Sequence, residues 1–158
     1  MADKKIDFIK SELFNSLSEI TPETKRNWGK MSPQHMVEHL TDFFNVSAGK
    51  LKFDLVTPGE QLPRYRDFLL SDKQFRENTQ APPSIVGSEP APLRNENIPA
   101  AIEGLQQSVN DFFEYYGGDD VEATVHPVFG PLNFDDWVRL HYKHVTHHLR
   151  QFGLKSYN

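Results

Sequence analysis

The chain has 158 residues, no cysteine and a formal net charge of -5 at pH 7. This length predicts a single domain, residues 1–158, built around one hydrophobic core. The lack of cysteine excludes disulfides, thiolate nucleophiles and thiolate metal ligands, and the negative charge argues against nucleic acid as a partner.

The beginning of the chain does not look like a targeting segment. Residues 1–20 contain lysines but no continuous apolar run, so we expect no signal peptide. No other stretch is long and apolar enough to span a membrane, so no membrane partner is expected. The absence of cysteine fits a reducing compartment. Together these features predict a soluble, cytoplasmic protein.

The first two predicted helices lie in the N-terminal third of the chain. Apolar residues recur at helical spacing over residues 2–17, which predicts the first helix. The second begins with Ser32 as N-cap and Pro33 at the first helical position, where the missing N–H of proline costs nothing. Its apolar stripe ends near Ser47.

Residues 51–97 give a weaker signal. This stretch contains six prolines, and only residues 61–70 have the pattern of a short helix. A loop of this length inside a compact domain is usually functional or mobile. We interpret it as a proline-rich excursion from the domain.

Two further helices follow the excursion. Residues 98–116 predict the third, and the fourth begins after Asn133 as N-cap and ends at Gly153. No segment has a convincing strand pattern. Four amphipathic helices predict an all-α fold, a four-helix bundle with the excursion between its second and third helices.

The fourth helix is rich in histidine. Four of the seven histidines lie in LHYKHVTHHLRQFG, residues 140–153. On an ideal helix His144 lies about 60° and His148 about 20° from His141, whereas His147 lies about 120° away. His141, His144 and His148 therefore share the buried face.

Buried imidazoles need a partner for each ring nitrogen, and a metal ion would supply one. His144 and His148 have the i, i+4 spacing that lets two imidazoles reach one divalent cation. The second helix adds His39 on its apolar stripe, with His35 one turn earlier. We therefore predict a metal site formed by His39, His144 and His148.

Simpler interpretations compete with this one. A single histidine on an apolar face is more often a hydrogen-bonded core residue than a ligand, and we prefer that interpretation for His126. His147 is predicted to lie in solvent or at the rim. For the cluster as a whole, the rival is a histidine-rich core that titrates near pH 6 and acts as a pH switch.

The segments MSPQHMVEHL and HVTHHLRQFG resemble the DinB-like superfamily, which includes YfiT-type proteins and bacillithiol- and mycothiol-dependent transferases. HPVFGPLNFDDW is similar to a branch whose members are mostly of unknown function. The resemblance implies an up-down-down-up bundle, often dimeric. It also implies a metal triad of His39, His144 and His148, with Gln151 three residues after the last ligand. His35 and His141 are additional to that pattern. Either could be a fourth ligand or a residue that lies behind the ligands.

Three neutral ligands would leave a coordination position open, as in catalytic sites. The first hypothesis is a hydrolase or thiol transferase that activates water or a low-molecular-weight thiol for a small-molecule substrate. Imidazole ligands suit zinc, nickel, iron and copper alike. The alternative is a non-enzymatic bundle in which the metal, if there is one, is structural and the protein binds a small molecule or a partner. A pocket beside the metal position would favour the enzyme.

Overall fold

The computed structural model describes residues 2–77, 79 and 89–154. The first helical segment is a continuous rod made of α1 (Ala2–Asp7), a π-helical turn (Phe8–Glu12) and α2 (Leu13–Leu17). Its helical spacing brings Ile9, Leu13 and Leu17 to one face, where all three are fully buried. The predicted helix over residues 2–17 is therefore confirmed, with a π-helical turn in its middle.

The other long helices begin where their capping residues predict. Ser32 caps α3 (Pro33–Ser47) by accepting a hydrogen bond from the backbone N–H of His35. Asn97 caps α6 (Ile98–Tyr116) by accepting one from Ala100. Asn133 and Asp136 form a reciprocal capping box at the start of α7 (Phe134–Gln151). In each case a side-chain oxygen accepts from a backbone N–H that has no partner within the helix.

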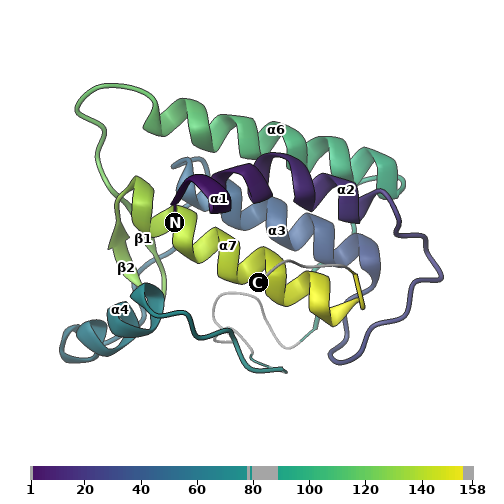
Figure 1. Ribbon diagram of the computed structural model, residues 1–158, viewed down its shortest axis with the longest axis horizontal. Helices are drawn as coiled ribbons and strands as arrows, with labels where there is room; N and C mark the ends of the chain where they lie inside the picture. Colours follow the sequence, from purple (N-terminus) through teal and green to yellow (C-terminus); the bar gives the residue numbers. More distant parts are fainter. Residues whose placement is uncertain (1, 78, 80–88, 155–158) are drawn as a thin grey trace.

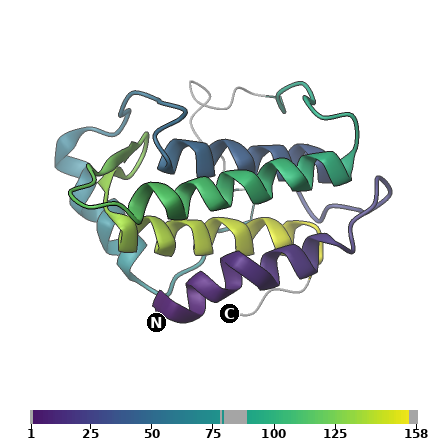
Figure 2. The same ribbon diagram turned by 90° about the horizontal axis from the view of Figure 1, so that it is seen from above.

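The rod, α3, α6 and α7 lie side by side along the long axis of the molecule (Figures 1 and 2). α3 packs along α6, and α7 contacts both α3 and α1. Figure 1 shows that the rod and α7 run in one direction, whereas α3 and α6 run in the other. A parallel pair such as α3 and α6 needs a connection that returns along the bundle, and residues 48–97 provide it. The predicted all-α class is confirmed.

The core consists of the inward faces of these helices. Its largest fully buried side chains are aromatic and aliphatic: Trp137, Phe44, Phe112, Ile9, Leu13, Leu17, Met36, Leu40, Leu69, Leu105, Leu132 and Leu149. Every long helix contributes to this set, so the core holds the four segments together. None of the described helices is long and apolar enough to cross a membrane.

A small β-hairpin, which the sequence did not predict, precedes α7. β1 (Thr124–His126) pairs antiparallel with β2 (Gly130–Leu132). Strands of three residues are too short to show the apolar alternation that identifies a strand. Gly130 has φ +83°, a left-handed conformation that favours glycine at the start of β2.

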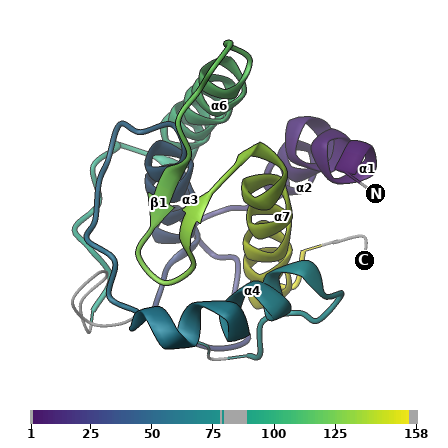
Figure 3. The ribbon, with the colours of Figure 1, turned by 90° about the vertical axis from the view of Figure 1, so that its left-hand side faces the viewer.

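The excursion includes α4 (Leu62–Leu70), so the helix predicted near residues 61–70 is confirmed. α4 lies across one end of the bundle, beside the hairpin (Figure 3). Lys143 on α7 anchors the end of α4, because its Nζ donates to the carbonyl oxygens of Ser71 (2.7 Å) and Lys73 (2.5 Å). The part of the excursion at residues 80–88, which holds two of its prolines, lies outside the described residues.

Candidate metal centre

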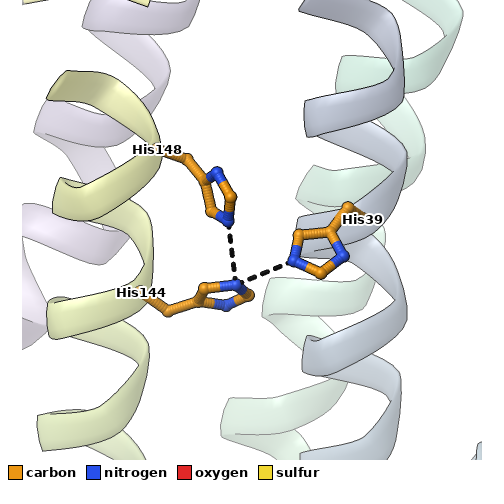
Figure 4. A group of neighbouring side chains, drawn as sticks. All are labelled: His39, His144 and His148. Carbon is orange, nitrogen blue, oxygen red and sulfur yellow. Dashed lines mark hydrogen bonds between the residues drawn. The ribbon is translucent and has the colours of Figure 1, made fainter. Parts of the chain in front are cut away.

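Three histidines from two neighbouring helices face one another (Figure 4). His39 comes from α3, on the stripe that also buries Met36 and Leu40, and His144 and His148 lie one turn apart on α7. The Nε2 atom of His144 lies 2.9 Å from Nε2 of His39 and 3.1 Å from Nε2 of His148. One ligand nitrogen from each of the three lies within 4.8 Å of the others. We call these residues the histidine trio.

The environment of the trio keeps the imidazoles neutral. Burial, with a smaller contribution from His147, lowers the pKa of His39 to about 4. Burial and the neighbouring histidines lower the pKa values of His144 and His148 well below the ordinary histidine value. A neutral imidazole has a free lone pair on one ring nitrogen, which is the form that binds metals.

Gln151 selects the tautomer of His148. The Gln151 amide N–H donates to the carbonyl oxygen of Trp28 (2.9 Å), so the amide oxygen must face His148. That oxygen lies 2.7 Å from Nδ1 of His148 and can only accept a hydrogen bond. Nδ1 of His148 therefore carries the proton, and the lone pair of Nε2 points toward His39 and His144. This is the arrangement that residues behind metal-binding histidines typically impose.

The loop between α2 and α3 holds Gln151 in place. The backbone N–H of Asn27 donates to the carbonyl oxygen of Gln151 (2.6 Å), and the Asn27 side chain donates to the carbonyl oxygen of Arg150 (2.9 Å). Gly29 has φ +82°, and a Cβ there would lie 2.7 Å from Nε2 of Gln151. The positive φ favours glycine here, and a side chain at this position would displace the Gln151 amide.

The donor set fits a divalent transition metal. A proton on Nε2 of His144 can be directed at only one of its two neighbours, so at least two lone pairs converge within the trio. A cation can accept from all three. Two nitrogens bound to one metal at tetrahedral angles lie about 3.4 Å apart, close to the 2.9 and 3.1 Å that separate Nε2 of His144 from its two neighbours. The histidine trio could therefore bind a metal ion, and three imidazoles do not select which one.

Two other histidines predicted near the site lie apart from the trio. The ring of His35 hydrogen-bonds to Ser32, where it completes the capping box of α3. His141 is fully buried, and its Nε2 lies 2.9 Å from Oγ of Ser47. Its ring stacks on Phe44 at a centroid distance of 3.7 Å. Neither histidine belongs to the group that could share one ion.

The prediction that His147 lies in solvent or at the rim is wrong. Its side chain is only 4% exposed. Its ring lies against Trp28 (5.3 Å between centroids) and Phe75 (5.7 Å), and the backbone of Phe75 hydrogen-bonds to it. Helical phase placed His147 at the edge of the buried face correctly, but phase does not show that two loops cover this edge.

His126 is a hydrogen-bonded core residue, as predicted. Its Nδ1 accepts hydrogen bonds from the backbone N–H groups of Val128 (2.9 Å) and Phe129 (3.2 Å), which fixes the turn of the hairpin. Burial lowers its pKa to about 3. His126 is therefore a neutral residue that shapes the hairpin.

The trio lines a cavity of about 1440 Å³. α3 and α7 contribute the three histidines, while the excursion and the hairpin contribute Tyr65, Phe68, Phe75 and Phe129. The cavity reaches the surface, because exposed side chains such as Arg64 belong to its lining. These aromatic residues were not predicted as part of the site, since they lie in the excursion and the hairpin, two segments whose paths the sequence does not reveal.

Trp28 and Gly29 were also missed. A glycine beside a tryptophan in a loop carries no signal of contact with a residue more than a hundred positions later. Of the residues behind His148, only Gln151 was expected, and that expectation came from the family resemblance.

Comparison with known proteins identifies the family of this chain. The sequence model of the DinB superfamily matches residues 11–152, which include the trio and Gln151. No curated protein and no solved structure gave a match. The family match covers most of the chain and confirms the resemblance based on the two histidine segments. The chain belongs to the DinB superfamily.

Proposed function

We propose that this protein is a metal-dependent enzyme, in which His39, His144 and His148 hold a divalent transition metal. One observation carries the proposal: three neutral imidazoles converge at a cavity that reaches the surface. Within the described residues no carboxylate and no fourth histidine joins the group. Three ligands and an accessible cavity are typical of catalytic sites, whereas structural sites are closed by four protein ligands.

The side chains around the trio have separate roles in this proposal. Gln151 holds the proton on Nδ1 of His148 and so keeps Nε2 available as a ligand. The cavity reaches the surface and is large enough to admit a small molecule. When bound, the metal would supply Lewis acidity, which lowers the pKa of a coordinated water to about 7 and deprotonates a coordinated thiol. The proposed reaction is therefore hydrolysis or transfer of a low-molecular-weight thiol.

Elemental analysis of protein purified without a histidine tag tests the metal site. We expect about one transition metal ion per chain in the wild type and almost none in His144→Ala. His35→Gln is the matched control, because it removes a histidine of the same helix pair while glutamine can preserve the capping box. Equal metal content in the wild type and His144→Ala would refute the site.

Cobalt substitution then separates an enzyme from a structural metal. An open coordination position should bind an added small thiol, which changes the visible spectrum of the cobalt protein. A spectrum that does not respond to thiol, azide or other small ligands would indicate a closed site. Where the spectrum responds, thiol-transfer and hydrolase screens with the metal-loaded wild type, and His144→Ala as the negative control, identify the reaction.

A further inference from the structure

The cavity beside the histidine trio is lined by more positive than negative side chains. Its charged lining residues are Lys30, Arg64, Lys73 and Arg76, against Asp67 and Glu89. This excess is opposite in sign to the charge of the whole chain, which is -5. Residue 78 and residues 80–88, which lie outside the described part, include no charged side chain, so they cannot balance the excess.

Three of these cations have no acidic partner among the described residues. Lys30 pairs with Glu89 at 3.1 Å. Arg64, Lys73 and Arg76 are exposed, and none of them forms an ion pair with a described carboxylate. We call these three residues the cationic rim. Unpaired charges of one sign around a cavity raise the local concentration of ions of the opposite sign.

The same segment supplies a continuous aromatic wall. Phe129 lies 5.7 Å from Tyr65 and 6.4 Å from Phe68 between ring centroids. Phe68 contacts Phe75 at 5.2 Å, and Phe75 contacts the ring of His147 at 5.7 Å. The aromatic wall therefore extends from α4 to the residue next to His148.

The wall and the rim alternate along the chain. Arg64 directly precedes Tyr65, and Lys73 and Arg76 lie on either side of Phe75. Both sets of residues line the same cavity, so a ligand that packs on the rings can reach the positive charges. A ligand with only an apolar body would leave these charges unused, and a small inorganic anion would leave the aromatic wall unused.

We propose that the cavity binds an organic anion, whose ring-containing body packs on the aromatic wall and whose anionic group lies at the cationic rim. That this anion is a substrate rests on the proposed function, whereas its binding does not.

A pair of probes that differ only in charge tests this inference. We would titrate the metal-loaded protein by calorimetry with 3-phenylpropionate and with 3-phenylpropionamide at low salt. The anion should bind about 10-fold more tightly than the amide, and added salt should reduce the difference. Equal affinities, or no binding of either probe, would overturn the inference.

Substitution of the rim locates the effect. An exposed ion pair contributes a factor of about 1.5 to 5 in affinity. The triple variant Arg64→Gln/Lys73→Gln/Arg76→Gln should therefore weaken 3-phenylpropionate about 10-fold and leave the amide unchanged. The matched control is Lys4→Gln/Lys25→Gln/Lys52→Gln, which changes the net charge equally at exposed positions outside the cavity lining. An equal loss in both variants, or none in the rim variant, contradicts the proposal.

Metal-stripped protein distinguishes this inference from the proposed function. If the rim holds the anion, the preference for 3-phenylpropionate persists without metal and still depends on the three residues. A preference that vanishes with the metal means that the carboxylate binds the metal itself, which overturns the role of the rim. Protein that cannot be loaded with metal but keeps the preference refutes the proposed function and supports the inference. Protein that loads with metal but shows no preference for 3-phenylpropionate supports the proposed function and refutes the inference.

Discussion

Removal of the side-chain oxygen of Gln151 tests how the protein prepares His148. Gln151→Leu keeps most of the volume of a side chain that is only 4% exposed. It deletes the acceptor that lies 2.7 Å from Nδ1 of His148. A metal on Nε2 requires the proton on Nδ1, so the bound state of the variant contains a buried N–H without this partner.

The expected loss follows from that unpaired donor. A buried donor without a partner costs about 1–3 kcal/mol. The free protein escapes part of this cost, because the ring can move its proton to Nε2 when no metal is present. The penalty therefore falls on binding, and we expect metal affinity to drop about 10- to 100-fold.

Competition with a chromophoric chelator measures this affinity. Gln107→Leu is the matched control, since Gln107 is exposed on α6 and only bonds to Asp111 one turn later. Gln151→Glu keeps an acceptor for His148 but places a carboxylate oxygen against the carbonyl of Trp28. It should lose stability while retaining metal affinity better than Gln151→Leu does. Wild-type affinity in Gln151→Leu would show that the amide does not set the tautomer.

Three further outcomes are expected. Gly29→Ala should lower the free energy of unfolding by about 1–3 kcal/mol in a urea titration, because its φ is +82° and the added Cβ meets the Gln151 amide at 2.7 Å; an unchanged midpoint would contradict the contact. Burial raises the pKa of Glu38, but hydrogen bonds from residues 34, 94 and 95 outweigh it and lower the pKa below 4.5. The wild type should therefore lose stability as the pH falls below that value, and Glu38→Gln should be less stable at pH 7 and less sensitive to acid; parallel pH profiles would refute this. Chelation should lower the melting temperature of the metal-loaded wild type, since a ligand at a hundredfold excess over its dissociation constant stabilises the folded protein by about 2.7 kcal/mol. His144→Ala should show no such shift. A shift of equal size in this variant would show that the chelator acts at a site other than the histidine trio.

The sequence was most informative where a local rule decides the structure. Ser32, Asn97 and Asn133 each begin a helix because their side chains accept from backbone N–H groups. The phase of α7 placed His144 and His148 on the buried face, as helix geometry requires. Both kinds of prediction depend on residues at most a few turns apart.

Long-range packing limited the prediction of the remaining residues. His35 had the i, i+4 spacing of a ligand pair with His39, yet its ring completes a helix cap. His141 had the correct phase, yet its Nε2 is directed at Ser47. His147 is buried by Trp28 and Phe75, which come from two separate loops. Spacing identifies which residues can share a face, but the partner of each ring depends on which segment packs against that face.

The structure divides the two tasks of the site between different parts of the chain. The ligand nitrogens are held by α3, by α7 and by the loop at residues 27–29, whose contacts with Gln151 are backbone-mediated. Much of the cavity wall comes from residues 61–76 and the hairpin. Lys143 attaches the end of α4 to α7, and the Thr57 hydroxyl donates to the carbonyl oxygen of Val128, which joins the excursion to the hairpin. Changes in the excursion should therefore alter which small molecules reach the site without altering metal affinity. Within one superfamily, such a division allows the metal site to stay constant while the excursion varies, because loops tolerate substitution better than the packed helices that hold the ligands.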